Sequence, residues 1–239
     1  MTDMGDRVML TYSNVVSLSH PIHPHIPLWA GDPPVEFEPV ADLQTDGYFL
    51  RRFAMGEHSS THMNAPNSFF SDGIGIDRYD PASLIRSAVV IDMRQPCAEN
   101  PDYCLSDRDI AAWEDKHTKI PANSVVLAFT GWQAKWQSPV DFLNLDEAGI
   151  PHFPGFGADV IQFLLAERAI AGIGIDTHGV DGGLDQTFAC NRQVLARQGI
   201  VLECLTNLDQ LPPVGITLVI APLPLQQGSG SPATVFALF

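Results

Sequence analysis

The sequence predicts a single-domain α/β protein, and three observations lead to this prediction. The chain has 239 residues, which suits one hydrophobic core, because single cores rarely grow beyond about 250–300 residues. Hydrophobic residues make up 45% and charged residues 17%, so a disordered chain is excluded. The 19 glycines and 19 prolines are a high share for a helical bundle and suit a turn-rich fold with strands. We therefore expect one domain over residues 1–239.

Short apolar runs bounded by turn residues predict the strands in chain order. After a first run at 15–18, residues 20–34 form a proline-rich loop, and residues 48–55 are apolar with basic interruptions. The further predicted strands cover residues 87–93, 124–131, 170–175, 200–205, 216–221 and 233–238.

Three segments predict helices. Ser106 and Asp109 have the spacing of a capping box and begin a helix that ends near residue 117. Residues 158–169 carry apolar side chains at helical spacing and lead directly into a strand. Residues 191–198 precede Gly199, which suits the end of a helix. A helix followed at once by a strand is typical of α/β proteins.

The charge and the cysteines limit the partners and the compartment. The formal charge is −15, which disfavours nucleic acid and anionic membrane surfaces as partners. No apolar run is long enough to span a membrane, and residues 1–11 lack the pattern of a signal peptide. The four cysteines show no Cys-x-x-Cys spacing. We expect a cytoplasmic protein.

A polar cluster at residues 56–69 is the candidate site. His58 and His62 are four residues apart and share a face in either a helix or a strand, and Asn64 and Ser68 continue the even spacing. Two imidazoles on one face can meet one metal ion. Histidines at this spacing are also common as hydrogen-bonded loop residues, so the pair alone leaves both interpretations open.

The same cluster resembles the signature His-x-Gly-Thr-His-x-Asp-x-Pro-x-His of the metal-dependent cyclase and kynurenine formamidase-like hydrolase family. Further similar segments follow in the family's order over nearly the whole chain. They are residues 17–21, 26–34, 130–132, 152–155, 172–177, 203–208 and 230–232. The resemblance implies a swivelling β/β/α fold with a central mixed, barrel-like sheet. It also implies a homodimer or homotetramer with pockets near the subunit contacts.

Members of this family hydrolyse a small amide, lactone or cyclic imide-like bond with water activated by one or two metal ions, commonly zinc or manganese. The resemblance places family metal ligands at His58, His62 and Glu203. The other three metal-site positions depart from the family, because the signature Asp is Asn64, its last His is Ser68, and a later His is Asn191. A neutral amide cannot bridge two cations as a carboxylate does, which argues against a two-metal site. We expect one divalent metal, zinc or manganese, on His58, His62 and Glu203.

Further residues are candidates for catalysis or substrate binding. The loss of His at position 68 removes a proton shuttle, and His178 is the candidate to replace it, although a loop histidine without a role is an equal alternative. Trp29 could pack on a planar substrate or anchor its loop to the core. Arg192 could bind a substrate carboxylate or form a surface ion pair. Asn64, Ser68 and Asn191 complete the expected substrate-binding set.

For the cysteines and for His20 we expect mainly structural roles. We expect Cys204 to be a core residue, because it follows Glu203 in a strand and points to the other face. Cys190 is a weaker candidate nucleophile. His20 is expected to be hydrogen-bonded inside the protein.

The leading hypothesis is a hydrolase of a small amide or lactone that uses one metal ion. Two alternatives remain open at this point. The pocket could serve a metal-free lyase, isomerase or cyclase, or the chain could bind a small molecule without turnover.

Overall fold

The computed structural model describes residues 10–239. The segment considered above for a signal peptide therefore lies almost wholly outside the described residues. None of the helices within 10–239 is long and apolar enough to cross a membrane.

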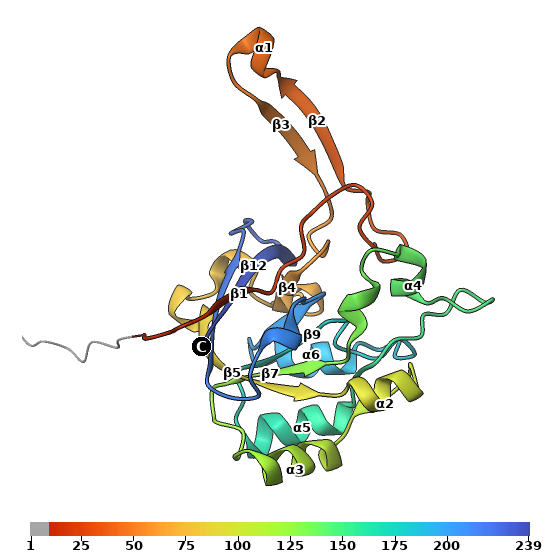
Figure 1. The fold of residues 1–239 in the computed structure, drawn as a ribbon, viewed down its shortest axis with the longest axis vertical. Helices are drawn as coiled ribbons and strands as arrows, with labels where there is room; N and C mark the ends of the chain where they lie inside the picture. The colour runs from red at the N-terminus through yellow and green to blue at the C-terminus, as the bar shows by residue number, and fades with distance from the viewer. Residues whose placement is uncertain (1–9) are drawn as a thin grey trace, which may run out of the picture.

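A closed mixed sheet forms the centre of the molecule (Figure 1). Its order is β1 (Val15–Ser17), β12 (Gly230–Leu238), β11 (Ile216–Pro222), β5 (Ile85–Asp92), β7 (Val125–Phe129), β9 (Gly172–Ile175), β10 (Ile200–Glu203) and β4 (His62–Asn64). Strand β12 also pairs with β4, which closes a ring of seven strands and leaves β1 at its side. Neighbouring strands from β5 to β10 are parallel, and the other pairs are antiparallel. The predicted α/β fold with a barrel-like mixed sheet is confirmed.

Helices cover the parallel side of the sheet. α3 (Asp107–Lys116) and α5 (Ala158–Glu167) lie beneath β5 and β7 in Figure 1, and α6 (Ala189–Leu195) contacts α5 and β10. Strand β7 shows why this arrangement is stable. Val126 and Ala128 point to the core under the helices, whereas Val125 and Leu127 point to the core inside the barrel. Burial on both faces explains its continuous apolar run.

The ends of the elements largely follow the sequence signals. Ser106 begins α3, and its backbone N–H donates to Asp109 at 2.8 Å, as the capping-box spacing predicts. Helix α6 begins two positions before the predicted start at Asn191. The short helices α2 (Arg94–Glu99) and α4 (Pro139–Leu143) and the paired strands β6 (Cys104–Leu105) and β8 (Gly155–Phe156) were not predicted.

A hairpin outside the barrel was only half predicted. β2 (Glu36–Ala41) pairs with β3 (Leu50–Ala54), and the four-residue helix α1 (Leu43–Asp46) forms its tip. The predicted segment 48–55 corresponds to β3. Its partner β2 alternates acidic and apolar residues around Pro39, which local sequence rules interpret as loop.

Candidate active-site pocket

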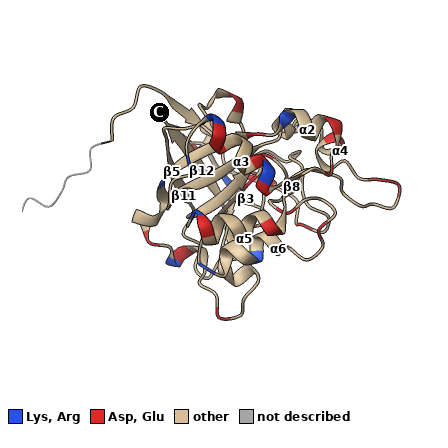
Figure 2. Ribbon diagram, turned by 90° about the horizontal axis from the view of Figure 1, so that it is seen from below, with Lys and Arg blue, Asp and Glu red and all other residues tan. Residues whose placement is uncertain are grey.

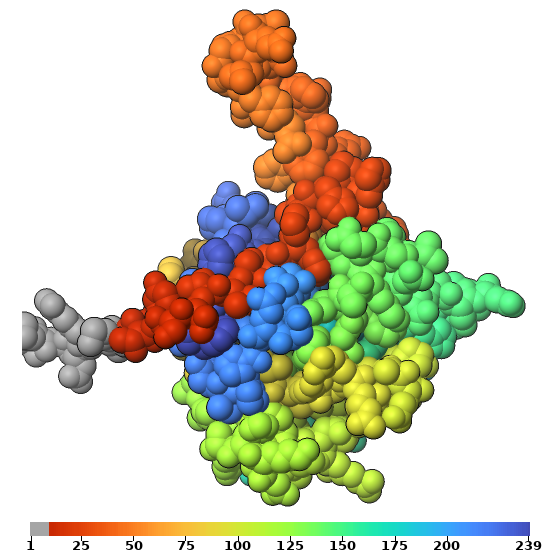
Figure 3. Space-filling view, in the orientation of Figure 1, coloured from red at the N-terminus to blue at the C-terminus, as the bar shows by residue number. Residues whose placement is uncertain are grey.

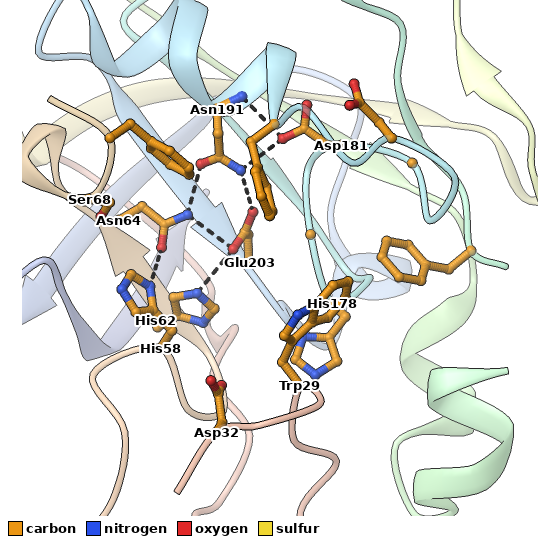
Figure 4. A pocket seen from close by; sticks show the side chains of 16 residues that line it. Trp29, Asp32, His58, His62, Asn64, Ser68, His178, Asp181, Asn191 and Glu203 are labelled. Atoms are coloured by element: carbon orange, nitrogen blue, oxygen red, sulfur yellow. Dashed lines mark hydrogen bonds and ion pairs between the residues drawn. The ribbon is translucent and has the colours of Figure 1, made fainter. Parts of the chain in front are cut away.

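Two adjacent strands bring the central site residues together. β4 and β10 are antiparallel, and their register places His62 opposite Glu203. Met63 is fully buried in the barrel core, so the alternation of side chains turns His62 and Asn64 to the other face. Asn191 reaches the same place from α6 (Figure 4).

Glu203 is held by four N–H donors. Its Oε1 accepts from the Val180 backbone N–H at 2.9 Å and from Asn191 Nδ2 at 3.0 Å. Its Oε2 accepts from Asn64 Nδ2 at 3.0 Å and faces His62 Nε2 at 3.0 Å. Burial alone would raise the pKa of Glu203, but the hydrogen bond and charge of His62, with the Val180 and Asn191 donors, lower this pKa to about 2. Glu203 is therefore an ionised, buried carboxylate.

His62 completes this ion pair. Its Nδ1 lies 2.8 Å from the Ser60 carbonyl oxygen, while Nε2 faces the Glu203 carboxylate. Both partners are acceptors, an arrangement that an imidazolium ring with an N–H on each nitrogen satisfies. The pair is almost completely buried. Removing one partner alone strongly destabilises the folded protein, because the other group stays buried without its partner.

His58 lies beside this pair but faces other groups. Its Nδ1 is 2.8 Å from Asn64 Oδ1, and its Nε2 is 2.9 Å from Ser229 Oγ. Asn64 uses its Nδ2 to donate to Asn191 and Glu203, so its Oδ1 accepts from His58. Burial and the neighbouring His62 lower the pKa of His58, against opposing contributions from Asn64 and Glu203.

The donor set does not fit the metal ion that the resemblance implies. A catalytic zinc site uses three protein ligands with lone pairs aimed at one point. Here only His62 and Glu203 converge, because both ring nitrogens of His58 point to other partners. The amide groups of Asn64 and Asn191 direct N–H donors at Glu203, where a cation would need lone pairs. Within the part of the chain that the structure describes, no three His, Cys, Asp or Glu side chains are arranged to hold a metal.

An aromatic pocket of about 270 Å³ adjoins the network. Trp29 is one wall, and its ring lies edge-on to Phe153 at 6.2 Å and to His178 at 5.2 Å between ring centroids. Phe69 and Phe188 also line the pocket. Four aromatic side chains around a small volume suit a flat, apolar ring. Trp29 therefore packs on Phe153 and His178 and lines the pocket, and its contact with a substrate stays a prediction.

His178 is the histidine of this pocket without an assigned partner. It is 7% exposed, and its Nε2 is buried with no hydrogen-bond partner among the described residues. Burial lowers its pKa, with a smaller contribution from the charge of His62, so the ring is neutral at pH 7. An unpaired buried nitrogen costs about 1–3 kcal/mol in a folded protein. A buried group without a partner calls for an explanation, and a catalytic role is one that the position of His178 in the pocket allows.

One carboxylate lines the pocket and a second lies behind it. Asp181 lines the pocket and accepts from the backbone N–H groups of Cys190 and Asn191 and from Asn191 Nδ2. Asp181 therefore orients the Asn191 amide that binds Glu203. Asp176 is fully buried outside the pocket lining and accepts from the backbone N–H and the hydroxyl of Thr130, which fixes that loop.

Other predicted residues have different surroundings. Ser68 lines the pocket, and its hydroxyl donates to the Ser229 carbonyl oxygen. Arg192 is exposed on α6, with its guanidinium over the Phe69 ring at 4.9 Å, and it is not part of the pocket lining. His20 was expected to be hydrogen-bonded; instead its ring stacks on Trp136 at 3.9 Å, and its Nε2 has no partner in the described chain.

The cysteines are core residues. Cys204 is 1% exposed, as predicted from its position after Glu203. Cys190 is also 1% exposed, and its thiol lies 3.2 Å from the Phe156 carbonyl oxygen. Burial and the nearby Asp181 raise the pKa of Cys190, which opposes formation of a nucleophilic thiolate. The weaker hypothesis of a Cys190 nucleophile is not supported by this geometry.

Sequence reasoning missed the outer parts of the site. Ser229 donates its hydroxyl and its backbone N–H to Glu57 at 2.6 and 2.7 Å, and it contacts His58 from the far end of the chain. Asp32 and Asp185 lie at the pocket as well. Glu57, which precedes His58, and the Gly/Ser turn before β12 are both polar segments visible in the sequence. No local pattern indicates that they lie together in the fold.

With this geometry established, comparison with known proteins identifies the family. The Cyclase family profile matches residues 16–182. The chain belongs to the Cyclase family. Within it, the chain is 32% identical to isatin hydrolase of Roseibium aggregatum over 256 aligned positions, covering 100% of this chain and 96% of that protein.

Two further Cyclase-family relatives agree. Kynurenine formamidase of Geobacillus thermodenitrificans is 26% identical, and the alignment covers 91% of this chain and 93% of that protein. The structure of isatin hydrolase A from Labrenzia aggregata bound to benzyl benzoate superposes with a TM-score of 0.89 at 32% identity, covering 94% and 93% of the two chains. The relatives of this chain are therefore amide hydrolases.

Proposed function

We propose that this chain hydrolyses the ring amide or lactone of a small, planar, cyclic molecule. The observation that carries the proposal is a pocket with aromatic walls that adjoins a buried, charged His62–Glu203 pair. The names of the relatives support an acyl substrate, and isatin is a flat bicyclic lactam of the kind that aromatic walls accommodate. Trp29 and Phe153 would hold such a ring by its faces and edges.

His178 is the residue that we assign to proton transfer. Its ring is neutral and lines the pocket, and its unpaired Nε2, which is closed to solvent in this conformation, would accept a proton from a water molecule after the ring turns toward the cavity. The water oxygen bonds to the ring carbonyl carbon, the carbon–nitrogen bond breaks, and the proton passes from His178 to the leaving nitrogen. The products are a carboxylate and an amine. His62 and Glu203 form a fixed, polar part of the pocket wall, because hydrogen bonds and their ion pair already occupy their polar atoms.

A direct assay tests this function. The purified protein is incubated with isatin and with bicyclic lactams and lactones of similar size, and ring opening is followed by absorbance and by the mass gain of one water. We expect turnover on at least one member of this set. The His178→Asn variant should lose about 100-fold or more in kcat with a small change in KM, because the proton acceptor alone is removed.

His25→Asn is the matched control, since His25 is an exposed histidine outside the pocket lining. Equal kcat for His178→Asn and the native chain would contradict the assigned role of His178. Failure to open any ring in the set would contradict the proposed hydrolysis.

A second candidate function follows from the saturated hydrogen bonds. Every polar atom of Glu203 and both ring nitrogens of His62 and His58 already have partners. Such a network suits a protein that binds a small cyclic molecule without turnover. Isothermal titration with isatin distinguishes the candidates, because a binder releases heat once and leaves the ligand mass unchanged.

A further inference from the structure

The aromatic pocket has an unbalanced charge. None of the 16 residues that line it in the described chain is Lys or Arg, whereas four carry carboxylates, namely Asp32, Asp181, Asp185 and Glu203. Burial lowers the pKa values of His58 and His178, so these two rings add no positive charge at pH 7. The pocket is therefore acidic, and an anionic group on a bound molecule would meet repulsion.

Three of the four carboxylates have partners in the protein. Glu203 is paired with His62 and accepts three further N–H groups. Asp181 also accepts three N–H groups. Asp185 accepts from the backbone N–H and the hydroxyl of Thr187 at 2.6 and 2.7 Å. These donors fix the three carboxylates in place and use much of their capacity to accept hydrogen bonds.

Asp32 is the carboxylate without such a partner. It forms no ion pair among the described residues, and no hydrogen bond joins it to the other labelled side chains of Figure 4. Its backbone N–H donates to the Trp29 carbonyl oxygen at 3.0 Å, and Gly31 has a φ of 95°. A tight turn with glycine at its third position therefore brings both Trp29 and Asp32 to the pocket.

This turn approaches the pocket from the surface. The chain before β2, drawn red in Figure 3, runs over the outside of the body beside the segment of α4, drawn green. Residues 29–31 are exposed and Asp32 is half-buried. In Figure 4, Asp32 lies on the opposite side of the His62–Glu203 pair from Asn191. An entering molecule therefore meets the turn before it reaches the buried strands.

An indole ring beside a carboxylate is suited to bind a cation. The face of the ring attracts an ammonium group, and the carboxylate accepts charge-assisted hydrogen bonds from it. Trp29 is 36% exposed, which leaves part of its ring open to a ligand. Arg192, the residue predicted to bind a substrate carboxylate, lies outside the pocket lining and donates to the Thr187 carbonyl oxygen at 3.1 Å. The turn and the lining therefore both favour a positive ligand.

The field of the whole chain has the same sign as the pocket. The sequence has 28 acidic against 13 basic residues, and Figure 2 shows acidic segments on many of the elements. Such a field raises the local concentration of cations and lowers that of anions. Local contacts and long-range electrostatics therefore favour the same kind of molecule.

We propose that the cyclic substrate carries a cationic amine, which packs on the Trp29 ring with its charge at the Asp32 carboxylate. The aromatic walls hold the ring of the substrate, and Asp32 selects its charge. This inference rests on the proposed function for the fate of the ring. The selection of charge is measured by binding alone, so the two proposals can fail separately.

Isothermal titration of the full chain with three matched lactams tests the inference. The probes are 5-(aminomethyl)oxindole, which is a cation, 5-(hydroxymethyl)oxindole, which is neutral and of similar size, and the anion oxindole-5-carboxylate. The 6-substituted isomers allow for either orientation of the ring. At pH 7 and low salt, one aminomethyl isomer should bind at least about 10-fold more tightly than its alcohol, and the carboxylates should bind most weakly. Added salt should reduce the preference.

Aspartate variants assign the preference to one carboxylate. Asp32→Asn should bring the affinities for the amine and the alcohol to within about 2-fold of each other, because the ion pair is lost. It should change the affinity for the alcohol much less. Asp72→Asn is the matched control, since it removes the same charge from an exposed aspartate outside the pocket lining, and it should keep the native preference.

The possible outcomes separate this inference from the proposed hydrolysis. Aminomethyl isomers that bind no more tightly than their alcohols would overturn the inference, even if the chain opens the isatin ring. A preference that Asp32→Asn retains would also overturn it. A preference that Asp32→Asn abolishes, in a chain that opens no ring, would support the cation site and contradict the hydrolysis.

Discussion

At the scale of single residues, the stability of the site depends on the buried His62–Glu203 pair. Replacing His62 with Leu leaves the Glu203 carboxylate buried without its charged partner. We expect a loss of about 3–5 kcal/mol in the free energy of unfolding at pH 7, measured by urea denaturation. His25→Leu is the control, because His25 is an exposed histidine of the early loop.

The pH dependence of this loss has a definite sign. The folded-state pKa of Glu203 lies at about 2, below its ordinary value of 4.5. The stabilisation from this shift is therefore present above pH 4.5 and disappears as the pH falls through 2. In the His62→Leu variant the carboxyl can take up a proton in mild acid, so the deficit should shrink between pH 7 and pH 4. An equal deficit at both pH values would show that packing, and not charge, is responsible.

A second residue-scale prediction concerns metal binding. The variant Asn64→Asp, Ser68→His, Asn191→His restores the family's ligand types at positions that the structure brings to one pocket. We expect it to retain more zinc or manganese after dialysis than the native chain, measured by elemental analysis. The change replaces N–H donors with lone-pair donors beside His62 and Glu203.

The variant Ser71→His/Gln193→His is its control, because it adds the same number of histidines outside the pocket lining. A triple variant that retains no more metal than this control would show that the pocket has changed beyond its ligands.

At the scale of elements, the contact between β12 and the His58 loop leaves no free space. A methyl group added at Gly230 would lie 2.6 Å from His58 Cε1 and 2.9 Å from the Met63 carbonyl oxygen. Gly230→Ala should therefore displace His58 and cost about 1–3 kcal/mol in the free energy of unfolding. Urea denaturation measures the cost, and the His58 ring signals in NMR report the displacement. Thr234→Ala, on an exposed position of the same strand, should change neither.

Sequence patterns predicted the strands and helices that bury their apolar side chains in the core. The five consecutive buried residues of β7 and the apolar stripe of α5 gave clear local signals. The hairpin of β2 and β3 gave a misleading signal, because Phe49 and Phe53 are apolar residues typical of a core but lie exposed. Local rules cannot distinguish an apolar residue that packs in the core from one that lies on a projecting hairpin.

The site was predicted only in part, because tertiary contacts supply the partners of its residues. His58 and His62 were found from their spacing and from the family signature, and Glu203 was found from the wider resemblance. The structure joins His62 to Glu203. Their hydrogen-bond partners decide the chemistry, and these come from the register of β4 against β10 and from the turn that carries Ser229. Such pairings depend on tertiary structure and leave no periodic trace in the sequence.

At the scale of the whole molecule, the closed ring of strands determines when the pocket can form. Asn64 and Glu203 are in contact although they are 139 positions apart in the chain, and His58 and Ser229 are 171 positions apart. Contacts so distant along the chain carry a large loop-closure entropy and form late in folding. A refolding chain should therefore acquire its helices well before it acquires any affinity for a ligand. In a cell, newly made copies would pass through a period in which they are compact, inactive and dependent on protection from aggregation.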